Sequence, residues 1–210
     1  MTYLFLTIIL IISGCSDMNE GHQGEVIERY IKIQNRSCVV VSENFDTTWR
    51  YGLPEIKVTG PESVVKNVIT EHSNHCLYIS MKADSGDYNH RIPLNIKSSN
   101  LSYFSATGFS KFDIKLMDEK KIAIELSGNA QGSIGGIVDQ VYIYTHNESD
   151  INAKNLEAKI VKIYSTGDTK ISVNPIEIMD IKATGSSEIY YLGDPKINKN
   201  ISKNIKLKKL

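Results

Sequence analysis

The sequence predicts an all-β fold built as a parallel β-helix, a solenoid with coils of about 20 residues. Three observations predict it. Apolar and polar residues alternate over short runs, which is typical of strands. The sequence has no amphipathic helical pattern of useful length. In the second half of the chain, turn-forming residues recur at a nearly constant spacing, which is typical of stacked repeats.

The first residues have the features of a bacterial export signal. An apolar run from Tyr3 to Ile12 is about half as long as a helix needs to cross a bilayer. It ends in Ile12-Ser13-Gly14-Cys15, which resembles the lipobox of bacterial lipoproteins. We therefore predict a signal peptide over residues 1–14 and lipid on Cys15. An uncleaved hydrophobic anchor is the alternative, because no Lys or Arg precedes the run.

Either alternative places the rest of the chain outside the cytoplasm. Ser16, rather than the Asp that retains lipoproteins at the inner membrane, favours the outer membrane, with the domain facing the periplasm or the surface. Residues 15–25 lack apolar periodicity and are expected to form a tether between lipid and fold. The remaining cysteines, Cys38 and Cys76, would then form a disulfide or pack separately as small apolar residues.

Residues 26–205 are expected to form the folded domain. Its first half contains alternating strand patterns, for example at residues 30–33, 55–58 and 77–80. Residues 62–68 fit a short helix and a strand equally well, because their β-branched side chains favour strands.

The second half of the chain repeats a turn. Its turn residues are Gly108, Gly128, Asn147, Gly167 and Gly185, separated by 20, 19, 20 and 18 residues. Asn is the residue that best replaces Gly where φ is positive, so we expect the same turn in each repeat.

Fixed positions around these turns predict the core. The residues four positions before them are all large and apolar: Phe104, Ile124, Ile143, Ile163 and Ile181. The residues four positions after them are Phe112, Gly132, Ile151, Ile171 and Ile189. Because Ile134 follows Gly132 by two places, a two-residue insertion is expected in the second repeat. An antiparallel sandwich competes with the solenoid, but hairpin turns of the Asn-Gly or Asp-Gly kind are absent between these strands.

The charged residues balance overall but not locally. The chain has 24 Lys plus Arg against 24 Asp plus Glu, so no general attraction to nucleic acid is expected. Six lysines crowd the end of the chain: Lys196, Lys199, Lys203, Lys206, Lys208 and Lys209. We expect these lysines to belong to a solvated tail or an end cap, with a basic tail over residues 206–210.

Several motifs together resemble one family. Leu126-Ser127-Gly128-Asn129-Ala130, residues 164–171 and residues 183–190 are similar to the repeated signature of the head GIN domain of putative auto-transporter adhesins. Residues 191–197 resemble its terminal motif, and residues 54–81 resemble an earlier segment. The departures are Asn147 for Gly and small residues at the position of the second Gly: Ala130, Ser149, Thr169 and Ser187.

The resemblance covers residues 26–205 and implies a right-handed β-helical domain of exported bacterial proteins, often lipoproteins. The resemblance implies no established activity, and it identifies no catalytic residues. We expect no cofactor. The sequence also lacks a phosphate-binding Gly-Lys-Ser/Thr loop, a His-Glu-x-x-His motif and a nucleophile elbow.

Two other sequence features bear on chemistry. The metal-like cluster of Glu71, His72, His75 and Cys76 has no common zinc spacing, so we expect an ordinary polar loop and no metal.

Carboxylates near the turns suggest an alternative function, that of a polysaccharide lyase or hydrolase. Asp150 and Glu188 share the third position after their turns, but Lys170 occupies it in the coil between, which favours charge balance.

The favoured function is binding. Tyr142, Tyr144 and Tyr164 alternate with the inward Ile columns and should form one outward face, with Tyr103 nearby in register. Such a face could bind an envelope glycan or protein, although tyrosine is also a common strand residue. We therefore expect a lipid-anchored binding, adhesion-type or structural module rather than an enzyme.

Overall fold

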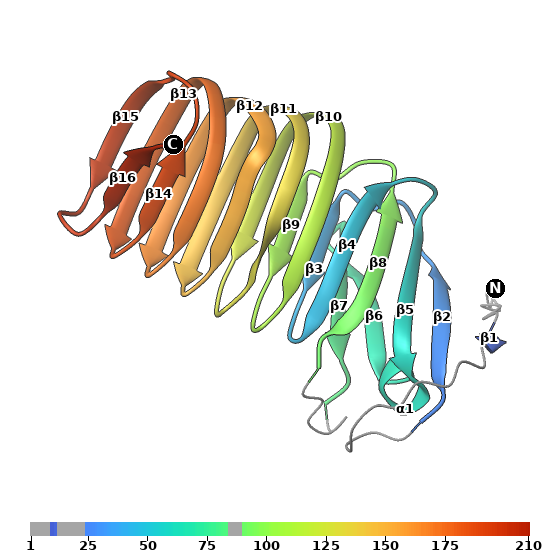
Figure 1. Ribbon diagram of the computed structural model, residues 1–210. Helices are drawn as coiled ribbons and strands as arrows, with labels where there is room; N and C mark the ends of the chain where they lie inside the picture. Colours follow the sequence, from blue (N-terminus) through green and yellow to red (C-terminus); the bar gives the residue numbers. More distant parts are fainter. Residues whose placement is uncertain (1–8, 12–23, 84–89) are drawn as a thin grey trace.

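The computed structural model describes residues 9–11, 24–83 and 90–210 (Figure 1). The repeated coils form an elongated stack, and the C-terminus lies at the end of this stack that is far from residues 26–98. In the described part of the chain, strands account for nearly all regular structure. The predicted parallel solenoid is therefore confirmed.

An N-terminal region, residues 24–98, mixes parallel and antiparallel pairing. Its elements are β2 (Val26–Lys32), β3 (Cys38–Val41), β4 (Phe45–Tyr51), β5 (Glu55–Pro61), α1 (Glu62–Val65), β6 (Val68–Ser73), β7 (Cys76–Met81) and β8 (Ile92–Ser98). Upstream, β1 (Ile9–Ile11) pairs antiparallel with β2. The pairs β2–β5, β5–β8 and β6–β7 are antiparallel, whereas β4–β8 and β3–β7 are parallel. The ambiguous segment thus becomes a single helical turn followed by a strand.

A coil region, residues 101–209, contains only parallel pairs. Its elements are β9 (Tyr103–Ala106), β10 (Lys111–Leu126), β11 (Gln131–Asn147), β12 (Asp150–Gly167), β13 (Lys170–Gly185), β14 (Glu188–Tyr191), β15 (Lys196–Ile201) and β16 (Lys206–Lys209). Each residue pairs with the residue about 20 positions later, as in Lys111 with Gln131 and Gln131 with Asp150.

Each of the strands β10 to β13 contains two runs, so the coils build two sheets. The first runs, beginning at residues 111, 131, 150 and 170, pair with one another, with β4 before them and with β14 after them. The second runs, ending at residues 126, 147, 167 and 185, pair with β9 and β15. We call these the first-run sheet and the second-run sheet. Their inner faces meet in the core, where the rings of Phe104 and Phe112 lie 5.3 Å apart.

The repeated turn has the predicted geometry. Positive φ angles occur at Gly108 (67°), Gly128 (71°), Asn147 (60°), Gly167 (109°) and Gly185 (93°). Space is tight where turns stack: a Cβ on Gly167 would lie 2.5 Å from the carbonyl oxygen of Asn147. Glycine is therefore required at this position for both its φ angle and its size.

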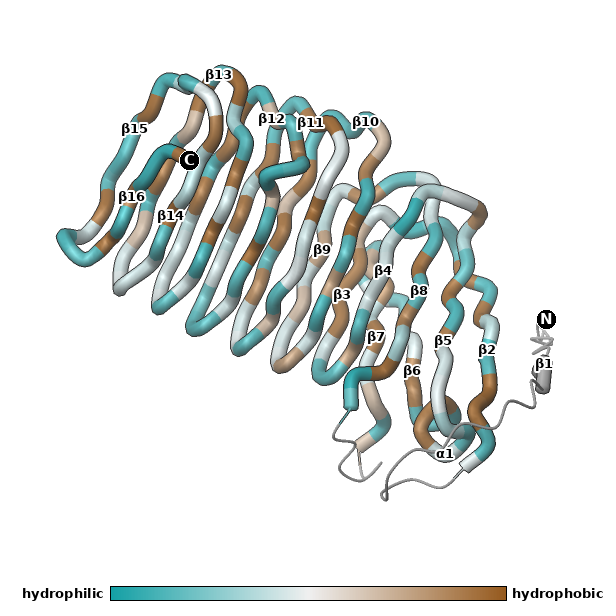
Figure 2. Tube along the Cα trace, viewed as in Figure 1, coloured by the Kyte–Doolittle hydropathy of each residue, from teal (hydrophilic) through white to brown (hydrophobic). Residues whose placement is uncertain are grey.

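The predicted inward column is buried. The five residues four positions before the turns are each at most 2% exposed, and their neighbours along the strands are more accessible. Hydrophobic and hydrophilic residues alternate along the coils as this arrangement requires (Figure 2).

The predicted two-residue insertion in the second repeat is wrong. Phe112 pairs with Gly132 and Ile114 pairs with Ile134, so the register is unbroken at these positions and shifts only between Lys115 and Asp118. A Cβ on Gly132 would lie 2.6 Å from the Phe112 ring. The Phe112 carbonyl oxygen would lie closer still, so both the backbone and the ring of Phe112 take up the space that a side chain at position 132 would need.

Small polar residues near the turns form a second buried column. Ser149, Thr169 and Ser187 are at most 2% exposed. The Thr169 hydroxyl donates a hydrogen bond to Ser187 (3.0 Å), and the Ser149 hydroxyl donates to the carbonyl of His146 (3.0 Å). These positions, where the resembling family often has glycine, therefore hold hydrogen-bonded hydroxyls inside the stack.

The C-terminal lysines do not form the expected tail. Residues 206–209 are β16, which pairs in parallel with β14. Lys206 contacts Glu188 at 3.0 Å, and Lys209 contacts Asp194 at 2.5 Å. The prediction of a tail was wrong because these lysines have acidic partners earlier in the chain, 18 residues before Lys206 and 15 residues before Lys209.

Candidate functional site

The outer face of the second-run sheet carries the three tyrosines that the sequence predicts to be neighbours. The rings of Tyr144 and Tyr164 lie 5.0 Å apart and nearly parallel, at 12°. Tyr142 and Tyr144 lie 6.4 Å apart at 11°. We call these three residues the tyrosine ladder. Tyr103 is in register with Ala123, and Ala123 with Tyr142, as the repeat spacing predicts.

Lysines from neighbouring coils cover the ladder rings. The Lys121 and Lys162 ammonium groups lie 4.5 Å and 5.3 Å from the centre of the Tyr142 ring. Lys182 lies 5.8 Å from the centre of the Tyr164 ring. Cations over ring faces are attracted by the negative charge of the π system. The ring faces are thus occupied by each other and by lysines, which leaves the ring edges, the hydroxyls and the ammonium groups for a partner.

Tyr103, which lies beside the tyrosine ladder, stays protonated. Tyr103 donates a hydrogen bond from its hydroxyl to Glu125 at 2.6 Å. Burial, aided by this carboxylate, raises the pKa of Tyr103 to about 12. Burial and the neighbouring tyrosines also raise the pKa of Tyr144. This face therefore combines neutral tyrosine hydroxyls, lysine ammonium groups and the Glu125 carboxylate, which is bonded to Tyr103.

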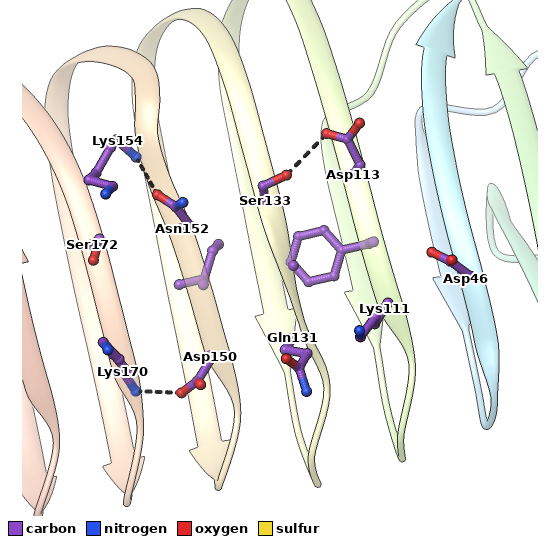
Figure 3. A pocket seen from close by; sticks show the side chains of 13 residues that line it. Asp46, Lys111, Asp113, Gln131, Ser133, Asp150, Asn152, Lys154, Lys170 and Ser172 are labelled. Carbon is purple, nitrogen blue, oxygen red and sulfur yellow. Dashed lines mark hydrogen bonds between the residues drawn. The ribbon is translucent and has the colours of Figure 1, made fainter. Parts of the chain in front are cut away.

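The outer face of the first-run sheet carries a polar groove of about 540 Å³ (Figure 3). It crosses five neighbouring strands, β4, β10, β11, β12 and β13. Its polar lining consists of Asp46, Lys111, Asp113, Gln131, Ser133, Asp150, Asn152, Lys154, Lys170 and Ser172. Ser133, a small outward residue on β11, leaves the sheet hollowed between longer side chains.

Sequence reasoning missed this groove, although the spacing could have shown it. The third position after each turn is polar throughout, in Lys111, Gln131, Asp150, Lys170 and Glu188. The fifth position is polar in Asp113, Ser133, Asn152 and Ser172. The two outward columns stand side by side on one sheet because strand side chains alternate.

The carboxylate of Asp113 is already engaged. It accepts hydrogen bonds from Arg50 at 2.5 Å and from the Ser133 hydroxyl at 3.1 Å. Burial raises the pKa of Asp113, but these two hydrogen bonds outweigh it and leave the pKa below its usual value. Asp113 therefore stays ionised, which is unlike the proton-donating acid of a glycosidase.

The third-position row alternates in charge, as the sequence predicts. Asp150 pairs in register with Lys170, and Lys170 with Glu188. The backbone N–H of Lys170 donates to the Asp150 carboxylate at 3.0 Å. Charge balance between coils, rather than a group of carboxylates, explains this row.

One member of the metal-like cluster of Glu71, His72, His75 and Cys76 is bound in a disulfide, so its sulfur is not a free thiolate ligand. Cys76 is joined to Cys38 by a disulfide between the parallel strands β7 and β3, with Cα atoms 4.5 Å apart. Burial lowers the pKa of His72. Within residues 9–11, 24–83 and 90–210, no group of three His, Cys, Asp or Glu side chains is arranged to hold a metal ion.

The predicted lipid site, Cys15, lies outside the described residues. Among the residues that are described, no helix has the length and apolar character needed to cross a membrane.

Comparisons with known proteins agree with the fold. Residues 37–195 match the family model of the "Putative auto-transporter adhesin, head GIN domain". A putative adhesin from Bacteroides fragilis is 20% identical with a TM-score of 0.63, covering 89% of this chain and 97% of its own. A putative lipid binding protein from Parabacteroides distasonis is also 20% identical, with a TM-score of 0.55, covering 90% and 98%. No curated protein matches the chain.

Proposed function

Because the chain belongs to the putative auto-transporter adhesin, head GIN domain family, we propose that it is an exported envelope protein that acts by binding. Lipid on Cys15 would hold it to a membrane, most simply the outer membrane. The names of the two similar structures, an adhesin and a lipid binding protein, also describe binding proteins. Their low identity supports the fold, so the argument for binding comes from the surface.

The observation that carries the proposal is the tyrosine ladder. Its rings come from two coils and are held parallel at 5.0 Å and 6.4 Å. Side chains held rigidly in this way lose little conformational freedom when a partner binds, which is why a few aromatics can dominate an interface. The adjacent lysines add donors for acidic or hydroxyl-rich partners. An envelope glycan or protein fits this surface.

A carbohydrate-active enzyme is the rival function, and the groove is where it would act. The groove contains Asp46, Asp113 and Asp150. Glycosidases need one carboxyl with a raised pKa to donate a proton to the leaving oxygen. The pKa of Asp113 is lowered instead, and Asp150 accepts a backbone hydrogen bond. The geometry therefore supports binding better than hydrolysis.

A glycan and envelope-protein binding screen with the full chain tests the proposal. We expect the triple variant Tyr142→Ser, Tyr144→Ser, Tyr164→Ser to remain folded and to lose binding at least tenfold. A control, Tyr51→Ser, removes an exposed tyrosine of β4 outside the second-run sheet and should bind like the wild type. If the folded triple variant binds every ligand from the screen as tightly as the wild type, the ladder is ordinary strand surface.

Metabolic labelling with a fatty acid tests the anchor separately. The wild type should incorporate label and fractionate with membranes, and Cys15→Ser should do neither. Equal labelling of the two proteins would contradict lipid attachment at Cys15.

A further inference from the structure

Three lysines line the polar groove, and two of them lie in register with an aspartate of a neighbouring strand, Lys111 with Asp46 and Lys170 with Asp150. Within the described part of the chain, no carboxylate forms an ion pair with Lys111, Lys154 or Lys170, and all three side chains are exposed. In contrast, Asp113 is paired with Arg50. Outside ion pairs, the described lining of the groove therefore holds three lysines against two aspartates, Asp46 and Asp150. The Lys170 ammonium also lies 5.9 Å from the centre of the Tyr190 ring.

The cations flank a floor of neutral hydrogen-bonding groups. Figure 3 shows Lys111 on one side and Lys154 and Lys170 on the other, with Gln131, Ser133 and Asn152 between them. The Asn152 carbonyl oxygen accepts the backbone N–H of Lys154 at 3.3 Å, which fixes the amide and leaves its NH₂ group as a donor. The groove thus combines fixed amide and hydroxyl groups with ammonium groups.

This combination restricts the class of ligand. An apolar molecule would leave the polar lining without partners. A nucleic acid strand would meet Asp46, Asp113 and Asp150 along its phosphates. A chain of sugars, however, can pair its hydroxyls with carboxylates, amides and serines, and an acidic substituent can pair with the lysines.

We propose that the groove on the first-run sheet binds an oligosaccharide that carries anionic groups, with Lys154 and Lys170 contacting the anion and Gln131, Asn152 and Asp150 contacting sugar hydroxyls. The anion can be a carboxylate or a sulfate, because an ammonium group binds both. The proposal goes beyond the proposed function, because the groove and the tyrosine ladder lie on the outer faces of different sheets.

Calorimetric titration of the detergent-purified full chain tests this site. The probes are oligogalacturonate for carboxylate groups, heparin oligosaccharide for sulfate groups, maltoheptaose as a neutral glycan and polyglutamate as an acidic peptide. The wild type should bind at least one anionic oligosaccharide at least tenfold more tightly than maltoheptaose or polyglutamate. Lys154→Gln with Lys170→Gln should weaken that binding at least tenfold.

Two controls distinguish this site from general charge attraction and from the ladder. Lys199→Gln with Lys203→Gln removes the same charge at the C-terminal end and should change affinity less than twofold. The tyrosine triple variant should also bind the oligosaccharide normally, so loss at one site is separable from loss at the other. Equal weakening in the Lys199 and Lys203 control, or equally tight binding of maltoheptaose or polyglutamate, would overturn the proposal. So would failure of both anionic oligosaccharides to bind.

Discussion

Residues 24–98 and residues 101–209 both form β-sheet around one continuous core, but different interactions hold them. In the N-terminal region, antiparallel and parallel strands meet, and a disulfide joins β3 to β7. Its largest buried side chain, Trp49, donates a hydrogen bond from its indole N–H to Ser98 at 2.9 Å. In the coil region, the same few positions recur in every coil. Stability there is spread over columns, which leaves both outer faces available for binding.

The largest effect should come from the turn that defines the coils. Gly167→Val should destabilise the protein by about 4 kcal/mol or more, because a side chain would clash with Asn147 at a φ of 109°. Urea unfolding measures this. Asn147→Gly, at the equivalent turn, should change stability by no more than about 1 kcal/mol. Similar losses in both variants would contradict the account of the turn.

The second-largest loss of stability should come from shortening a side chain of the buried column. Ile163 is fully buried, so Ile163→Ala should cost about 2 to 5 kcal/mol. Its neighbour Lys162 points outward, and Lys162→Ala should cost at most about 1 kcal/mol, since it removes only a contact with Tyr142 at 5.3 Å. Equal losses in chemical denaturation would show that the two side chains do not face opposite sides of the strand.

The turn residues and the buried column were predictable because each position recurs in several coils of the same sequence. Five turns at near-constant spacing place Ile163 and its equivalents in the core without knowledge of any contact. The tyrosine ladder followed from the same spacing. The repeat could not show that Gly132 makes room for Phe112, because that packing depends on how closely the Phe112 backbone and ring approach from the preceding coil.

The N-terminal region offered no such repeat, and its topology was not predictable. Strands at residues 30–33, 55–58 and 77–80 were visible in the alternation, but their partners were not. β2 pairs with β5 across 22 intervening residues, and the sequence shows no periodic pattern that predicts such non-local pairing. The polar groove was missed for another reason: its outward columns contain charged and small residues that are also ordinary on a strand surface.

The disulfide should affect the N-terminal region more than the coils. Cys38→Ser with Cys76→Ser should lower stability by about 2 to 4 kcal/mol, because the bond closes a loop of 38 residues in the unfolded chain. Amide hydrogen exchange should become faster in β3, β6 and β7 and remain slow in β12. Exchange that rises equally in β12 would show that the two regions are not held independently.

The smallest effect concerns the junction of the two regions, where Arg50 of β4 contacts Asp113 of β10. The pKa of Asp113 lies below its usual value of 3.8, so the pair stabilises the fold above that pH. This stabilisation should disappear as the pH falls through the lowered pKa. In an NMR titration, Arg50→Ala should raise the pKa of Asp113, whereas Lys97→Ala, which breaks the Lys97–Glu55 pair, should not. An unchanged pKa in Arg50→Ala would mean that the ion pair does not link the regions.

The central claim, that the coil region is a stack of equivalent units, is tested most directly by removing one unit. Deleting residues 148–167 joins Asn147 to Asp168 and takes out one complete coil, because Asn147 and Gly167 are equivalent in register. Deleting only residues 158–167 removes half a coil and breaks the register. Urea unfolding followed by circular dichroism should show one cooperative transition at a lower midpoint for the complete-coil deletion, and no folded baseline for the half-coil deletion. If the complete-coil deletion is as unfolded as the half-coil deletion, the coils are not equivalent units.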